Sequence, residues 1–215
     1  MIPAERKAYW YRLARSSLHV GLACWNRLGI HGRSNVPVEG GCVVASNHAS
    51  FLDPPIIAAG ARHRAVHFMA RDTLFKGFLA WMLPRVCVIP LSRERGDVAA
   101  LRKSIELLKK GYCVGLFPEG TRTTTGDLQP AKGGIGFLLA KAHVPVVPAY
   151  ISGSYDAYPK GASRIRPSKI NVYFGPPITA AEIAVLGSDR AAYEKVGALV
   201  MSRIAALKAT ADVKA

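Results

Sequence analysis

Acidic residues are scarce in this sequence of 215 residues, in which 14 Asp and Glu stand against 29 Lys and Arg, a formal net charge of +15. A chain with so little negative charge is expected to meet an acidic partner, such as nucleic acid, an anionic membrane surface or a phosphorylated substrate. About half of the residues are hydrophobic, which excludes a disordered chain and allows a sizeable core. The length suits one domain, or one domain with a short extension.

Cysteine is also rare, and its spacing excludes the common metal sites. The four cysteines form no C-x-x-C pair, and none stands at metal-ligand spacing from a histidine. Each lies in an apolar stretch, so we expect small buried thiols in a reducing compartment and no metal site. The cysteines are Cys24, Cys42, Cys87 and Cys113.

Long hydrophobic runs are missing as well, since no stretch approaches the roughly 18 uncharged apolar residues of a spanning helix. Residues 16–26, between Arg15 and Arg27, loosely resemble the core of a signal peptide. Gly21, however, stands where a lipoprotein signal has a branched residue. We therefore expect a protein at the cytoplasmic face of a membrane, peripheral or monotopic, rather than an exported one.

The N-terminal segment, residues 3–30, has the pattern of an amphipathic helix. At 100° per residue its polar side chains share one narrow face, and apolar and aromatic residues cover the rest. Such a helix either lies in a membrane interface or docks on the core of its own domain. The net charge of +5 over residues 1–33 favours the membrane. We predict a membrane-interface segment over 1–38 and a globular domain over 39–215.

From residue 42 onward, short apolar runs alternate with helical patterns. This alternation predicts an α/β fold: a single domain with a largely parallel sheet flanked by helices. We expect strands at 42–46, 65–69, 86–90, 113–117, 145–150 and 170–174, and helices at 54–61, 72–83, 97–110, 133–142 and 189–208.

The first motif with chemical meaning is Asn47–Asp53, which follows an apolar strand and precedes a helix that Pro54 can start. A turn there would bring the Asp53 carboxylate to the His48 ring, fixing its tautomer and making the other ring nitrogen a general base. No nucleophile motif accompanies the pair, so the attacking hydroxyl would belong to a substrate. In isolation, this spacing is better explained by a helix-capping Asp53 beside a space-filling His48.

The second motif, Phe117–Arg122, also follows an apolar strand, at the end where open α/β sheets bind ligands. Its glycine would let the backbone approach a ligand, and Arg122 could clamp a phosphate with two hydrogen bonds. Lys132 opens a predicted helix whose free N–H groups would add an anion site. Alone, the motif is also explained as a polar loop with a solvated arginine.

Two further stretches, Ile89–Arg93 and Val144–Pro148, are individually unspecific, and the prolines of the latter suit an edge strand or a strand end. Together, however, the four ordered blocks N-H-x4-D, Ile89–Arg93, F-P-E-G-T-R and Val144–Pro148 resemble those of the glycerolipid acyltransferase family. The resemblance covers about residues 40–178. The second block has Ser92 where many relatives carry a carboxylate.

The resemblance implies transfer of a fatty acyl group from acyl-CoA or acyl carrier protein to the hydroxyl of 1-acylglycerol-3-phosphate (lysophosphatidate), without a cofactor. His48 would be the general base and Asp53 would orient it. Acceptor binding would fall to Arg93, Glu119, Gly120, Thr121, Arg122 and Lys132. The N-terminal helix would hold the enzyme on a membrane with anionic lipid. Relatives with these blocks also acylate glycerol-3-phosphate, other lysophospholipids or lyso-ornithine lipids, so the acceptor stays open.

Two other functions compete with acyl transfer. The basic charge would suit a nucleic-acid-binding protein, but the sequence has no helix-turn-helix signature, RNP motif or zinc finger. Its excess of bases also gathers near the N-terminus and over residues 62–110, where the net charge is +7. A thioester hydrolase, with water in place of the acceptor, is the third candidate.

Overall fold

A seven-stranded sheet forms the centre of the computed structural model, which describes residues 4–91, 96–132 and 134–213. The strand order is β1-β7-β6-β2-β5-β3-β4, and all neighbours are parallel except β6 and β7. The strands are β1 (Gly29–His31), β2 (Cys42–Ser46), β3 (Val66–Arg71), β4 (Val88–Leu91), β5 (Cys113–Leu116), β6 (Val146–Ser152) and β7 (Asn171–Phe174).

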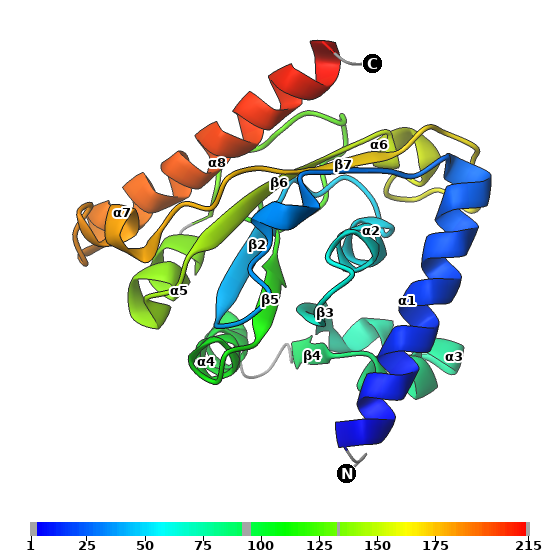
Figure 1. Ribbon diagram of the computed structural model, residues 1–215, viewed down its shortest axis with the longest axis horizontal. Coiled ribbons are helices and arrows are strands. Elements are labelled where there is room, and N and C mark those ends of the chain that lie inside the picture. Colours follow the sequence, from blue (N-terminus) through cyan, green and yellow to red (C-terminus); the bar gives the residue numbers. More distant parts are fainter. Residues whose placement is uncertain (1–3, 92–95, 133, 214–215) are drawn as a thin grey trace.

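Helices cover both faces of this sheet, which confirms the predicted fold class (Figure 1). They are α1 (Ala4–Asn26), α2 (Asp53–Gly60), α3 (Gly77–Met82), α4 (Gly96–Lys109), α5 (Gly134–Ala142), α6 (Ser154–Ala157), α7 (Ala180–Ala184) and α8 (Arg190–Val213). Short 3₁₀ turns lie at Arg33–Asn35, Asp72–Leu74 and Leu83–Arg85.

Alternate residues of the central strands divide the core into two layers, as the period of a strand requires. Val43 and Val114 pack with α4, α5 and α8 on one face. Cys42 and Val44 pack with α2 and Leu22 of α1 on the other. Because both faces are covered, the central strands are apolar throughout, which is why the sequence shows them as continuous apolar runs.

Several expected elements differ from the observed ones. The helix expected over 72–83 is broken, because Lys76 is extended and Gly77 has a φ of +52°. The helical segment expected over 3–30 ends at Asn26, and Gly29–His31 forms an unpredicted strand parallel to β7. Helix α8 runs five residues beyond the predicted end, to Val213.

The expectation that Val144–Pro148 is an edge strand or a strand end is wrong for Pro148, which lies inside β6 between β2 and β7. Pairing with β7 begins only at Ala149, opposite Phe174, and a separate bridge joins Val146 to Ile178. Pro148 falls in the gap between these pairs, where its carbonyl accepts from Gly175 N at 2.8 Å. A missing N–H is tolerated there because the ladder is already interrupted.

Helix α1 docks on the domain through a mixed face, on which Tyr11 and Leu22 are buried together with Asn26. Asn26 donates to the carbonyls of Arg166 and Ser168, Arg15 donates to that of Arg62, and Tyr11 Oη accepts from Val66 N. The apolar residues Tyr9, Leu13, Leu18, Val20 and Trp25 are instead 41–62% exposed. The outer side of α1 therefore exposes several apolar residues among polar ones such as Ser16 and Ser17.

The structure also corrects the expectation that all four thiols are buried. Cys24 is exposed on α1 and Cys87 is half-buried, whereas Cys42 and Cys113 lie side by side in the core. Within the described residues, none of the helices combines the length and the apolar character needed to cross a membrane.

Candidate active site

The first and third blocks meet where the neighbouring strands β2 and β5 end. The register of the two strands aligns Ala45 with Leu116, so the loops that begin at Asn47 and Phe117 leave the sheet side by side. The carboxyl ends of parallel strands are where α/β sheets bind ligands. The topology therefore brings together two motifs that lie about 70 residues apart in the sequence.

His48 and Asp53 form the contact that their spacing predicts. Nδ1 of His48 lies 2.8 Å from Oδ2 of Asp53, which is fully buried at the start of α2. The same oxygen accepts the backbone N–H groups of Ala49 and Ser50, each at 2.7 Å. A carboxylate held by these donors favours the tautomer in which Nδ1–H donates to it, leaving Nε2 free to accept a proton.

The third block and Thr123, which follows it, hold the backbone of His48 from both sides. The N–H of His48 donates to Oε1 of Glu119 at 3.2 Å, and its carbonyl accepts from Thr123 N at 2.8 Å. The Phe117 ring also stacks on the imidazole, with centroids 3.9 Å apart and planes 13° apart. These contacts hold the imidazole ring in place. The side chain of His48 is still 18% exposed, so a substrate can reach it.

Glu119 is buried, with 1% of its surface exposed, and its Oε2 has no hydrogen-bond partner within the described chain. Burial raises the pKa of its carboxyl to about 7, the hydrogen bond from His48 N opposes this rise, and the charge of Asp53 adds to it. The hydrogen bond that Glu119 forms in the structure is with the main chain of His48.

Arg122 lies over the Phe51 ring, with its guanidinium carbon 3.5 Å from the ring centroid. Its Nη1 is buried and has no hydrogen-bond partner in the described part of the protein. Burial lowers the pKa of the guanidinium below its usual range. An arginine that is stacked, partly desolvated and unpaired is suited to bind an anion.

The other predicted binding residues are less uniformly placed. Gly120 makes the turn after Glu119 with a φ of +68°, where a Cβ would lie 3.0 Å from Lys132 Cδ. Thr121 is half-buried, and the exposed Lys132 is tied to the turn by its N–H, which donates to Pro118 O at 2.9 Å. Arg93 lies outside the described residues, beyond the end of β4 at Leu91.

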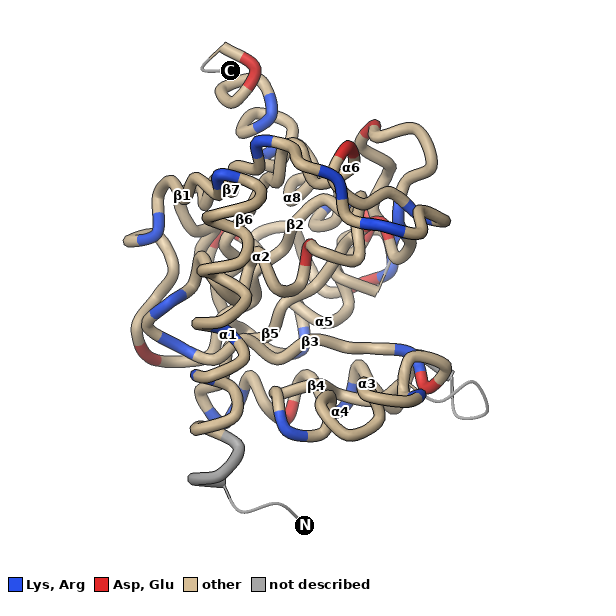
Figure 2. The backbone as a smooth tube through the Cα atoms, turned by 90° about the vertical axis from the view of Figure 1, so that its right-hand side faces the viewer, with Lys and Arg blue, Asp and Glu red and all other residues tan. Residues whose placement is uncertain are grey.

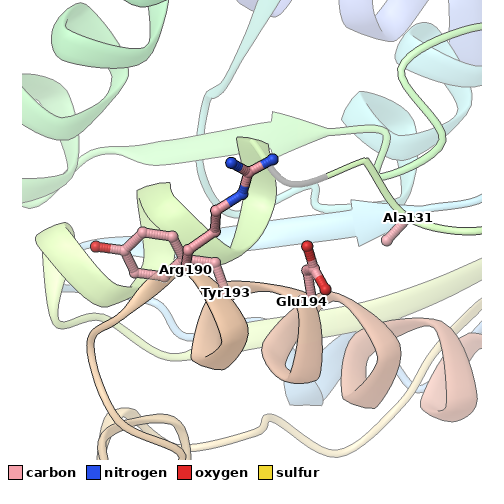
Figure 3. A pocket seen from close by; sticks show the side chains of 4 residues that line it. All are labelled: Ala131, Arg190, Tyr193 and Glu194. Atoms are coloured by element: carbon pink, nitrogen blue, oxygen red, sulfur yellow. The ribbon is translucent and has the colours of Figure 1, made fainter.

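One hollow lies outside these blocks. It has a volume of about 570 Å³ and is lined by Arg190, Tyr193 and Glu194 of α8 and by Ala131 of the loop before α5 (Figure 3). None of the four belongs to a block of the motif, although Ala131 directly precedes Lys132. Within the described ranges, no cluster of three or more His, Cys, Asp or Glu side chains could hold a metal ion.

Comparison with known proteins places this chain in a family. The sequence matches the model of the family described as Acyltransferase over residues 27–152. The chain belongs to the glycerolipid acyltransferase family. This finding confirms the resemblance carried by the four blocks and the expected class of enzyme, an O-acyltransferase.

Several relatives carry more specific names. The chain is 28% identical over 179 residues to the 1-acyl-sn-glycerol-3-phosphate acyltransferase of Bacillus subtilis, covering 83% of this chain and 87% of the relative. It is 31% identical to a chloroplastic enzyme of that name from Arabidopsis thaliana, covering 86% of this chain and 52% of the relative. The chain thus spans about half the length of that plant relative.

A solved structure is similar over nearly the whole chain. The crystal structure of the 1-acyl-sn-glycerophosphate (LPA) acyltransferase PlsC from Thermotoga maritima superimposes with a TM-score of 0.77 and 28% identity. The match covers 97% of this chain and 84% of the other. The α/β architecture is therefore shared with a solved acyltransferase.

Sequence reasoning missed supporting residues of this candidate site. Asn47 exchanges two side-chain hydrogen bonds with the backbone of Ile151, at 2.8 and 3.0 Å, and so ties the His48 loop to β6. Phe117 and Phe51 supply the stacking surfaces for His48 and Arg122. Asn47 and Phe117 lie inside the first and third blocks, so their place in those motifs was the available signal.

We expect the buried carboxyl of Glu119 to make the stability of this acyltransferase depend on pH. An unfolded glutamate titrates near 4.3, whereas Glu119 in the folded protein titrates at about 7. The folded state therefore holds the extra proton between these values, and its stability falls as pH rises through that window. Between about pH 5 and pH 8, the wild type should lose about 2 kcal/mol of unfolding free energy relative to Glu119→Gln.

Urea unfolding at each pH measures this difference, and the amide oxygen of the substituted side chain can still accept from His48 N. The matched control is Glu39→Gln, at an exposed position, which should keep the pH dependence of the wild type. Identical pH profiles for the wild type and Glu119→Gln would show that the Glu119 carboxyl is already ionised in the folded protein at low pH.

Proposed function

We propose that this acyltransferase moves a fatty acyl group from a thioester, acyl-CoA or acyl carrier protein, to the free hydroxyl of 1-acylglycerol-3-phosphate, giving phosphatidate. The observation that carries the proposal is the contact between His48 Nδ1 and Asp53 Oδ2, together with the Nη1 of Arg122, which has no hydrogen-bond partner among the described residues. The names of the relatives support lysophosphatidate as the acceptor. The proposed reaction uses the two substrates and the residues of this chain, with no cofactor.

The substrate supplies the nucleophile in this mechanism. Within the described residues, Nε2 of His48 has no hydrogen-bond partner, so it is free to accept the proton of the acceptor hydroxyl. The hydroxyl oxygen attacks the thioester carbonyl and forms the ester C–O bond as the C–S bond breaks. His48 then returns the proton to the departing sulfur, so the products are an ester and a free thiol. Asp53 stabilises the imidazolium between these two steps.

The acceptor phosphate is assigned to the basic residues beside His48. Arg122 offers a fork of N–H donors next to the site, and Nη1 lacks a partner within the described residues. Arg93 and Lys132 are proposed as further phosphate ligands, and Gly120 and Thr121 form the turn that the phosphate would approach. Glu119 is given a positioning role through the backbone of His48.

Acyl transfer is tested with labelled acyl-CoA or acyl carrier protein, with and without lysophosphatidate. The proposal requires thiol release that depends on the acceptor and the appearance of labelled phosphatidate. Release without the acceptor would indicate a thioester hydrolase, and no release with either donor would favour a binding protein. A panel with glycerol-3-phosphate, other lysophospholipids and lyso-ornithine lipid identifies the acceptor by its kcat/KM.

We further propose that the enzyme lies on the cytoplasmic face of a membrane, held by α1 and α3. Several apolar residues of α1 are exposed, and Trp10 of α1 contacts Trp81 of α3, with ring centroids 5.2 Å apart. Phe78 and Trp81 of α3 are 69% and 45% exposed, and the Arg85 guanidinium lies over the Trp81 ring. Aromatic residues next to bases are typical of surfaces that insert into a membrane interface containing anionic lipid.

Substitution of the outward residues should weaken membrane binding without unfolding the domain. Deletion of α1 would remove Tyr11 and Leu22 from the core, so the sharper test is the triple variant Leu13→Gln, Val20→Gln, Trp25→Gln. We expect its partitioning onto vesicles containing anionic lipid to fall by about 10-fold, because three apolar side chains no longer enter the interface. The measurement is co-sedimentation with vesicles at low and high salt.

The control for this experiment replaces polar residues of the same helix, Ser16→Gln and Ser17→Gln, which are also exposed. This control should partition like the wild type. Unchanged partitioning of the triple variant would show that α1 does not contact the lipid.

A further inference from the structure

The connection between β6 and β7 carries a basic strip that the reaction described above does not use. We define the basic strip as Lys160, Arg164, Arg166 and Lys169. All four are exposed, and residues 159–169 contain no Asp or Glu. None of the four forms an ion pair with any residue that the structure describes. Figure 2 shows Lys and Arg gathered along the loop beside α6.

Hydrogen bonds hold the strip in a defined place. Asn26, at the end of α1, donates to the carbonyls of Arg166 and Ser168 at 3.1 and 3.2 Å. Arg166 N donates in turn to Ala157 O at 2.8 Å, which closes the loop on α6. The four bases are therefore presented on a backbone tied at several points rather than on a loose loop.

The strip also lies beside the catalytic loop. Tyr158, which precedes it, accepts a hydrogen bond from Ser50 Oγ at 2.8 Å, and its ring lies 6.1 Å from that of Phe51. Ser50 and Phe51 belong to the His48–Asp53 loop. The strip therefore starts where the reacting groups are held, at the edge of the sheet where β6 ends.

The order of strands relates the position of the basic strip to the two motifs of the candidate site. His48 follows β2, Arg122 follows the neighbouring β5, and the basic strip follows β6, the neighbour of β2 on the other side. Both substrates of the proposed reaction are anionic: the acceptor through its phosphate, the donor through the carrier of its thioester. Arg122 is assigned to the acceptor phosphate, which leaves the bases of the strip available to the donor.

We propose that the basic strip is a docking surface for an acidic acyl carrier protein, which presents its acyl phosphopantetheine arm to His48. The proposal rests on the acyl transfer proposed above. The four bases are spread over ten residues and stand exposed, as suits the charged surface of another protein. Residues 159–169 contain no aromatic side chain on which the adenine of coenzyme A could stack.

The basic strip is less suited than α3 to contact a membrane. Within residues 159–169, Ile165 is the one large hydrophobic residue, and it is 44% exposed. The aromatic residues Phe78 and Trp81 lie with Trp10, near the opposite end of α1 from Asn26. Trp10 and the aromatic residues of α3 thus lie toward the other end of α1 from the basic strip.

The test compares two donors on one set of variants. In the strip variant, Lys160, Arg164, Arg166 and Lys169 are all replaced by Gln. The matched control replaces four exposed lysines that lie away from the site, Lys109, Lys110, Lys141 and Lys195, also by Gln, and so changes the net charge equally. The kcat/KM of each protein is measured with palmitoyl acyl carrier protein and with palmitoyl-CoA, at fixed lysophosphatidate and at low and high salt.

We expect kcat/KM for the carrier-protein donor to fall by about 10-fold or more in the strip variant, because electrostatic attraction mainly speeds association. Its salt dependence should weaken with it. The values for palmitoyl-CoA and for the control variant should change by less than about two-fold, within what surface charges away from a site contribute.

Other outcomes overturn the proposal. An equal loss with both donors would assign the strip to an anionic group common to both, and lost vesicle binding with unchanged kcat/KM would assign it to the membrane. A wild type that uses palmitoyl-CoA but not the carrier protein refutes the docking surface while the proposed function stands. If no donor reacts, the proposed function fails, and direct binding of carrier protein, measured by fluorescence anisotropy on both variants, still decides the docking question.

Discussion

His48→Ala should lower kcat by at least about 100-fold, since general-base catalysis contributes roughly 10²- to 10⁴-fold to enzymatic rates. The variant removes the ring nitrogen that would take the proton of the acceptor hydroxyl, whereas Arg122 and the turn at Gly120 stay in place. The KM values of both substrates should therefore change little. Steady-state kinetics with the acceptor and the thioester varied separately measures both effects.

A second variant separates chemistry from packing, because the imidazole also stacks on Phe117. His48→Phe keeps an aromatic ring against Phe117 but has no base, so its kcat should be as low as that of His48→Ala. His143→Asn, at an exposed position with a φ of +51° that Asn tolerates, serves as the histidine control and should be fully active. Near-normal turnover in folded His48→Phe would remove His48 from the mechanism.

The pairing of His48 with Asp53 was predictable because it is local. They are five positions apart. The apolar strand before them and the helix start at Pro54 after them fix the turn that joins them. The central strands were predicted closely for a similar reason: β2 and β5 are buried on both faces, so their sequences are continuously apolar. Where the local pattern is dictated by burial, the sequence states it directly.

Features set by tertiary contacts could not be predicted in this way. The periodicity of α1 separates a polar face from an apolar one, but it does not say which face meets the protein. That choice depends on Asn26 and Tyr11 finding backbone partners at Arg166, Ser168 and Val66, far away in the sequence. Strand β1 is only three residues long and exists because β7 offers it an edge.

The role of Glu119 shows the same limit within the site. Its place in the third block marked it as a binding residue, and from the sequence it could orient Arg122 or a substrate hydroxyl. The described contacts instead join Oε1 to the backbone N–H of His48, a residue that precedes it by 71 positions. The motif was visible in the sequence. Which of its residues bind substrate and which position His48 depends on how the loop after β5 packs against the loop after β2.

The assignment of Arg122 to the acceptor phosphate leads to the second large effect. Arg122→Ala removes a guanidinium that stacks on Phe51 and carries a buried, unpaired Nη1 in the part of the chain that the structure describes. Loss of such a charge-assisted contact is worth about 1.5–3 kcal/mol, or roughly 10- to 150-fold. We expect the KM for the acceptor to rise by that factor and the KM for the thioester to stay nearly unchanged. Arg93→Ala, from the second block, should act in the same direction.

Arg122→Lys should recover only part of the loss, because an ammonium group cannot reproduce the two-pronged fit of a guanidinium to phosphate oxygens. Arg203→Ala, which removes an exposed guanidinium on α8, is the control and should leave both KM values unchanged. The measurement is steady-state kinetics on folded proteins with each substrate varied in turn. If the thioester KM rises instead, Arg122 binds the donor, and the assignments of the acceptor site and the donor site must be exchanged. If neither KM moves, Arg122 binds no substrate, and the phosphate lies at Lys132 and the start of α5.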